Sequence, residues 1–105
     1  MSGGDQIEKV RSGSELNAAS HYDELRMDRV WPEIRAERWR QECKIRTGKI
    51  PWDCADPDVS DDAKLAVLAE EFGEVARALL ESGGNLRDEL IQTAAVAVAW
   101  AESLV

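Results

Sequence analysis

Acidic side chains gather at two places in the second half of this chain, and they are the side chains best suited to chemistry. Glu70, Glu71 and Glu74 are close neighbours in the sequence, and Glu89 and Gln92 follow after a pair of glycines. At roughly 100° per residue on a helix, the first three glutamates share one side, opposite an apolar stripe. Carboxylate and amide oxygens that converge from two facing helices form a hard-oxygen site, which suits Mg²⁺ or Mn²⁺.

A solvated helix face is the alternative interpretation of these glutamates, because glutamate is a good helix former that usually lies in water. Two observations weigh against it. The acidic face is bracketed by Val67 and Ala78, and neither Glu70 nor Glu71 has a Lys or Arg three or four positions away, where pairing on a helix works. A face of like charges without local partners favours an external cation.

Three helical segments and a long loop are expected to position these residues, together with a weak helix at the start of the chain. Pro32 suits the first turn of a helix, so the weak helix is expected over 14–30 and a second one over 32–46. Residues 49–59 hold two prolines and three aspartates, which is typical of an extended loop. Ser60 and Asn85 are N-cap residues, which predicts helices over about 61–82 and about 85–104. The fold class is therefore all-α, without strands.

The turn Gly83-Gly84 requires the last two helices to lie antiparallel as a helical hairpin. Reflection about this turn places Glu74 at the level of residue 93. Glu74, Glu89 and Gln92 are then about one turn apart, on the order of 5–6 Å along the axis. Gly73 is expected to let a neighbouring segment approach closely.

Residues 90–101 carry no charge and are apolar on every side, which is typical of a buried helix. Glu89 stands at the start of this segment, and a buried carboxylate must be paired or bound to a metal. The alternative to a metal is an ion pair with an arginine of residues 32–46. Because one chain is too small to cover the segment, we expect a second copy of the chain to cover it and form a symmetric four-helix core.

The stretch Glu70-Glu71-Phe72-Gly73-Glu74-Val75-Ala76, followed by Glu89-Leu90-Ile91-Gln92, resembles the EExxE…ExxD signature of MazG-like, all-α nucleoside triphosphate pyrophosphohydrolases. The resemblance covers about residues 64–104, with a weaker echo over Glu37–Gln41 and at Lys44. It implies a single helical domain over 14–105, whereas the glycines and serines of residues 1–13 predict a mobile tail. It also implies cleavage of an NTP or dNTP to the monophosphate and pyrophosphate, and assembly into dimers or tetramers.

The resemblance also assigns roles. Glu71, Glu74 and Glu89 are expected to bind Mg²⁺, and Glu70 is expected to be a further ligand or the base that orients water. Gln92 stands where the family has aspartate, and an amide oxygen coordinates without charge. The alternative function is therefore a catalytically weak or inactive module that senses nucleotides or binds proteins.

Arg38, Lys44 and Lys49 are the candidates for contacts to substrate phosphates, and Trp52 is the candidate for stacking on the base. The alternatives are ion pairs between these cations and the acidic half of the chain, and a Trp52 that plugs the hairpin. A triphosphate carries about four negative charges, so an acidic protein needs a cation to hold it.

Composition narrows the classes of function. The 105 residues carry a net charge of −8, and residues 53–105 hold 3 basic and 12 acidic side chains. This balance excludes a nucleic-acid polymer as the main partner. No apolar run is long enough to span a membrane, no signal-peptide core is expected, and two cysteines indicate a cytoplasmic protein.

Overall fold

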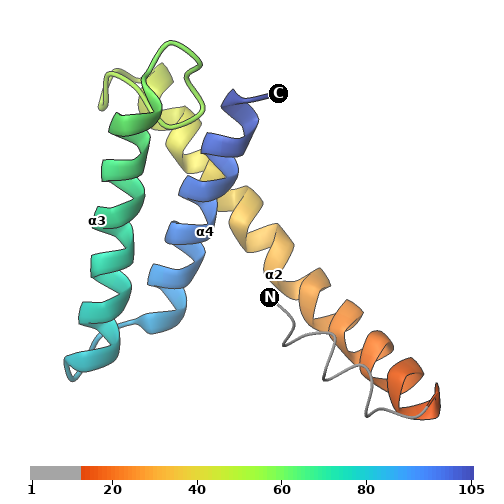
Figure 1. Cartoon of the computed structure of the whole chain (residues 1–105). Coiled ribbons are helices and arrows are strands. Elements are labelled where there is room, and N and C mark those ends of the chain that lie inside the picture. Colours follow the sequence, from red (N-terminus) through yellow and green to blue (C-terminus); the bar gives the residue numbers. More distant parts are fainter. Residues whose placement is uncertain (1–12) are drawn as a thin grey trace. The chain divides into compact units, whose positions relative to one another are not determined.

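The computed structural model describes the backbone of residues 13–105 and the side chains of residues 25–105. Within this range the chain forms three helices and no strand, namely α2 (Gly13–Arg46), α3 (Asp61–Leu80) and α4 (Leu86–Ser103) (Figure 1). The all-α prediction is confirmed. The predicted mobile tail lies outside the described residues except for Gly13, which is helical. No helix in the described part combines the length and the apolar composition that crossing a membrane requires.

Helix α2 corrects the prediction of two separate helices, because it continues through Pro32. Proline inside a helix removes one backbone donor and crowds the preceding turn, which costs about 3 kcal/mol. The remaining backbone hydrogen bonds are not affected, so a proline need not end a long helix. The chain nevertheless divides into two units after Trp31, directly before this proline. All contacts of the candidate site lie within the second unit, residues 32–105.

Local capping signals set the start of both C-terminal helices. The Ser60 side chain accepts a hydrogen bond from the backbone N–H of Ala63 at 3.2 Å, and two aspartates occupy the first turn of α3. The Asn85 side chain accepts from the backbone N–H of Asp88, also at 3.2 Å. Both predicted caps are confirmed.

Helices α3 and α4 lie side by side and antiparallel, as the short glycine turn requires (Figure 1). Side-chain hydrogen bonds join the start of α3 to the end of α4. The Lys64 ammonium, on a fully buried side chain, donates to the Ser103 hydroxyl at 2.8 Å. The Trp100 indole N–H donates to the Asp61 carboxylate at 2.8 Å. These contacts fix the level of the two helices relative to each other.

The turn itself requires glycine at two positions. Gly83 has a φ of +85°, in the left-handed region that favours glycine. A Cβ atom on Gly84 would lie 2.5 Å from the backbone carbonyl oxygen of Ala78. Gly73 behaves differently, because no atom lies within 4 Å of a Cβ built there. The expectation that Gly73 admits a close neighbour is therefore wrong within the described chain.

We expect Gly84→Ala to lower the free energy of unfolding by about 1–3 kcal/mol, because the new methyl group meets a backbone atom that cannot move aside. Gly73→Ala is the matched control in an open helix interior, and it should raise that free energy by about 0.5–1 kcal/mol. Chemical denaturation of both variants checks this. Equal effects of the two substitutions would contradict the packing of the turn.

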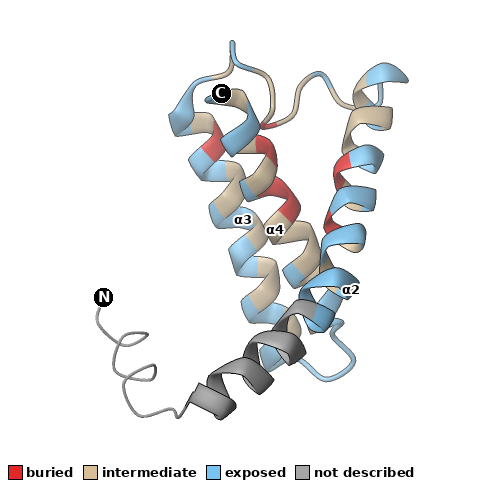
Figure 2. Ribbon diagram, turned by 90° about the vertical axis from the view of Figure 1, so that its right-hand side faces the viewer, coloured by how far each residue is buried: buried red, intermediate tan, exposed pale blue. Residues whose placement is uncertain are grey.

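The described part of the chain has a small apolar core and many exposed large apolar side chains. The buried apolar residues of the described part are few, and α4 carries most of them (Figure 2): Ile34, Cys54, Ala95, Val96 and Ala99. The predicted apolar stripe of α3 is divided between the interior and solvent: Leu68 packs against the buried cluster around Val96 and Val75 is half-buried, whereas Leu65, Phe72 and Leu79 are 56%, 68% and 66% exposed. Of the three α3 glutamates, Glu71 is half-buried, whereas Glu70 is exposed and the Glu74 side chain is 41% exposed.

Candidate functional site

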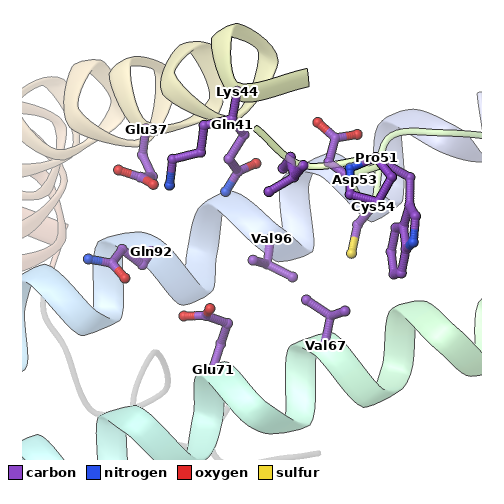
Figure 3. A pocket seen from close by; sticks show the side chains of 12 residues that line it. Glu37, Gln41, Lys44, Pro51, Asp53, Cys54, Val67, Glu71, Gln92 and Val96 are labelled. Carbon is purple, nitrogen blue, oxygen red and sulfur yellow. The ribbon is translucent and has the colours of Figure 1, made fainter. Parts of the chain in front are cut away.

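A cavity of about 400 Å³ lies between α2, the loop after it, and the facing sides of α3 and α4 (Figure 3). Every one of these elements contributes to its wall. The lining residues are Glu37, Gln41, Lys44, Ile50, Pro51, Trp52, Asp53, Cys54, Val67, Glu71, Gln92 and Val96. The cavity thus brings together four of the residues that the sequence singled out: Glu71, Gln92, Lys44 and Trp52.

Glu71 is the most unusual of these side chains. Its carboxylate points into the cavity (Figure 3), and its Oε2 atom is buried without any hydrogen-bond partner in the described chain. Burial raises the pKa of Glu71 above its ordinary value, and nearby carboxylates, first that of Glu89, raise this pKa further. A buried oxygen of this kind costs free energy unless a proton or a cation satisfies it.

The cavity has two chemically different ends. Glu37, Glu71 and Gln92 lie around one end, and Cys54 and Val67 lie at the other (Figure 3). Trp52 belongs to the apolar end, because it packs against the small core cluster that contains Cys54. Such a cavity fits a ligand with an anionic, cation-binding part and a flat apolar part.

The other predicted metal ligands lie near Glu71 but do not line this cavity. Glu70 is exposed, and Glu74 pairs with Arg77 at 3.3 Å. Glu89 is half-buried, and no described residue forms an ion pair with it. The alternative of an arginine partner for Glu89 from residues 32–46 is therefore wrong.

The carboxylates of Glu89, Glu70 and Glu74 all raise the pKa of Glu71, so the negative charge is concentrated around that side chain. Within the part of the chain that the structure describes, no three Asp, Glu, His or Cys side chains are already arranged as a metal-ligand set. A cation that used several of these carboxylates would therefore require their side chains to adopt other rotamers.

Arg38 occupies a different environment from the one predicted for a phosphate contact. It is only 8% exposed, and its guanidinium donates to both carboxylate oxygens of Glu102, at 2.9 and 3.0 Å. It also binds Glu42 at 2.9 Å and Asp53 at 3.5 Å. These bonds, chiefly that to Glu102, raise the pKa of Arg38. The alternative prediction, pairing with the acidic half of the chain, describes this residue.

We expect Arg38→Leu to lower the free energy of unfolding by about 2 kcal/mol, because the largely buried Asp53 carboxylate and the half-buried Glu42 carboxylate lose their positive partner. The loss at Glu102 should be small, because that side chain is 50% exposed to water. Arg35→Leu, on the exposed side of the same helix, is the control and should change it by less than about 0.5 kcal/mol.

The effect of Arg38→Leu should also depend on pH. Arg38 lowers the pKa of Glu102 below its ordinary value of 4.5. The stability contributed by this pair is therefore present above pH 4.5 and is lost as the pH falls through the lowered pKa. Thermal denaturation between pH 3 and 7 checks this, and a constant difference across that range would contradict the assignment.

The remaining predicted cations and aromatic residues divide between the cavity and the surface. Lys44 is exposed and contributes to the cavity wall, whereas Lys49 is exposed and does not line it. Trp52 lines the cavity and also packs against the core cluster, as the alternative of a plug over the hairpin predicts.

The sequence predictions gave Lys44 a role on α2, but they gave Glu37 and Gln41 no role beyond the weaker resemblance over Glu37–Gln41. Glu37, Gln41 and Lys44 all line the cavity. Their spacing of four and then three residues places them on one face of a helix, which is the signal that identifies such a row. The contribution of Asp53, Cys54 and Val96 depends on tertiary packing and has no comparable local signal.

Comparisons of the chain with protein-family models, with curated proteins and with solved structures find no match.

Proposed function

We propose that this protein is a Mg²⁺-dependent nucleoside triphosphate pyrophosphohydrolase that cleaves an NTP or dNTP to the monophosphate and pyrophosphate. The observation that carries the proposal is the unpartnered, buried Oε2 of Glu71 in a cavity whose polar end is acidic. This site fits a divalent cation such as Mg²⁺, because these ions prefer carboxylate oxygens as ligands and Oε2 of Glu71 accepts no hydrogen bond from any described residue. The resemblance of residues 64–104 to MazG-like enzymes is consistent with the same chemistry.

Different residues of the cavity would bind the phosphates, the base and the cation of the nucleotide complex. Lys44 is placed to donate to a phosphate oxygen, and Trp52 offers a ring at the apolar end for a base. Glu71 would hold Mg²⁺ together with Gln92, and rotamer changes would bring Glu74 and Glu89 to the ion. When bound, Mg²⁺ would neutralise phosphate charge and polarise the reacting phosphorus.

The neutral amide of Gln92 favours one alternative function. Gln92 lines the cavity where a carboxylate would add a further charge for cation binding. A site with a weakened cation affinity suits a module that senses nucleotides or binds a protein without useful turnover. Turnover separates the two functions, because nucleotide binding without release of pyrophosphate would favour the module.

Gln92→Asp should lower the Kd for Mg²⁺ by about tenfold and raise the rate of pyrophosphate release at limiting Mg²⁺, because it adds a charged oxygen to the polar end of the cavity. Isothermal titration calorimetry and a rate measurement at submillimolar Mg²⁺ check this. An unchanged affinity would show that charge at position 92 does not limit the site.

A second copy of the chain is the occupant that we propose for the outward apolar faces. The stripe of α3 repeats at three- and four-residue spacing, and α4 carries a matching row of apolar residues that are all half-exposed or exposed: Leu90, Ala94, Ala97 and Ala101. Rows of this spacing on an antiparallel helix pair are typical of one half of a four-helix bundle. We therefore propose a homodimer or homotetramer built on α3 and α4.

The decisive test of the proposed function is release of pyrophosphate from a panel of canonical and modified NTPs and dNTPs, with Mg²⁺ and with EDTA. We expect turnover of at least one nucleotide in Mg²⁺ and none in EDTA. Absence of turnover with every nucleotide would overturn the enzymatic proposal. Thermal stabilisation by Mg²⁺ plus nucleotide, measured in parallel, would then distinguish the module from a purely structural helical domain.

A further inference from the structure

We propose that Glu37, on α2, is a further ligand for the cation of this site, so that the ion is held from three helices rather than from the α3–α4 hairpin alone. The inference rests on the proposed function, because it concerns the same cation. It extends the set of expected ligands to a helix that the acidic signature does not include. It also gives a role to the Glu37 carboxylate, which is largely buried and faces the same cavity as the Glu71 carboxylate.

Glu37 is buried further than a surface carboxylate, because its side chain is only 14% exposed. It points toward the polar end of the cavity, near Gln92 and opposite Glu71 (Figure 3). Its charge is close enough to contribute to the raised pKa of Glu71. Two partly buried carboxylates that face one cavity repel each other, and a divalent cation between them would remove that repulsion.

The two oxygens of Glu37 have different partners. Oε1 accepts a hydrogen bond from Nε of Arg40 at 2.8 Å and lies 2.6 Å from Nη2 of the same ion-paired guanidinium. Oε2 accepts no hydrogen bond from any residue in the described part of the chain. One oxygen is therefore available to a cation without breaking the existing ion pair.

A second cavity, of about 350 Å³, adjoins the first, and Glu37 and Gln92 line both. Arg40 belongs only to this second cavity, and its side chain is 61% exposed. Glu71, in contrast, lines the first cavity and not the second. This arrangement makes Arg40 a competitor of the cation for the charge of Glu37, and a flexible one, since an exposed arginine moves aside at little cost.

The experiment is calorimetric titration of Mn²⁺, without nucleotide, into the full-length wild type and matched variants. We expect Glu37→Gln to raise the Kd about tenfold to 100-fold. Glu33→Gln removes the same charge one turn earlier on α2, beside the second cavity only, and should change the Kd by no more than about threefold.

Variants of Arg40 test the inference independently, because loss of a merely structural ion pair would not change the Kd for Mn²⁺. Arg40→Met should lower the Kd severalfold, whereas Arg87→Met, which breaks the similar pair with Glu33, should not. The double variant Glu37→Gln with Arg40→Met should bind Mn²⁺ as weakly as Glu37→Gln alone, because Arg40 acts through Glu37.

The outcomes separate this inference from the proposed function. Wild type that binds no Mn²⁺ overturns both. Wild type that binds Mn²⁺ with an affinity unchanged by Glu37→Gln overturns the role of Glu37 and leaves the hairpin site standing. Circular dichroism of each variant establishes that the helices are intact, so that weaker binding reports the site rather than unfolding.

Discussion

Glu71→Gln is expected to lower Mg²⁺-dependent release of pyrophosphate by at least about 100-fold, because it removes the buried charge around which the site is built. The same substitution should stabilise the metal-free protein at neutral pH, by about 1 kcal/mol, since the folded protein no longer buries a carboxylate without a partner. Loss of activity together with a gain of stability is typical of a functional site and not of a structural carboxylate.

The stability gained by Glu71→Gln should depend on pH in a direction that the pKa of Glu71 determines. The pKa of Glu71 is raised above its ordinary value of 4.5 in the folded protein. The folded state then binds more protons than the unfolded state between 4.5 and the raised pKa, so stability rises as the pH falls through that interval. The stabilising effect of Glu71→Gln should therefore shrink as the pH falls toward 4.5. Thermal denaturation from pH 8 to 4.5, with the exposed Glu81→Gln as control, checks this. A stability difference that grows toward acidic pH would contradict the assignment.

Phe72→Glu is expected to convert the proposed homo-oligomer into monomers, raising its dissociation constant by at least about 100-fold. Phe72 is the most exposed large side chain of the α3 stripe, at 68%, and a charge there would have to be buried against the second copy. Sedimentation velocity over a concentration series measures the shift.

Leu80→Glu is the matched control for Phe72→Glu. Leu80 is 83% exposed but lies beside the stripe, one residue after Leu79. Assembly should survive this substitution. A wild type that is monomeric at high concentration, or equal disruption by both variants, would contradict the proposed packing of α3 and α4.

The parts of the fold that depend on neighbouring residues could be predicted from the sequence. Ser60 and Asn85 begin their helices because a capping side chain acts within one turn, and Gly83-Gly84 sets the antiparallel hairpin for the same reason. Glu71 and Gln92, which the resemblance places in one site, also line one cavity.

The parts that depend on distant residues could not be predicted. Arg38 donates hydrogen bonds to Glu102, which is 64 positions away, and no local sequence pattern predicts that pair. Pro32 predicts a helix start, but whether a proline ends a helix depends on how much packing holds the helix on either side.

The aromatic residues of α2 show a further limit of sequence analysis. Large aromatic rings are highly buried on average, yet Trp31 and Trp39 are 51% and 57% exposed. Trp39 stacks on the Arg46 guanidinium, 5.0 Å from the ring centroid, which partly offsets its exposure.

The most direct test of the central claim, that Glu71 and its neighbours hold a divalent cation, is the electron paramagnetic resonance signal of free Mn²⁺ as it is titrated into the protein. We expect a saturable loss of signal, about one ion per chain, that Mg²⁺ reverses and that Glu71→Gln abolishes. A signal that rises as it does in buffer alone, or a loss that Glu71→Gln leaves unchanged, would contradict the claim.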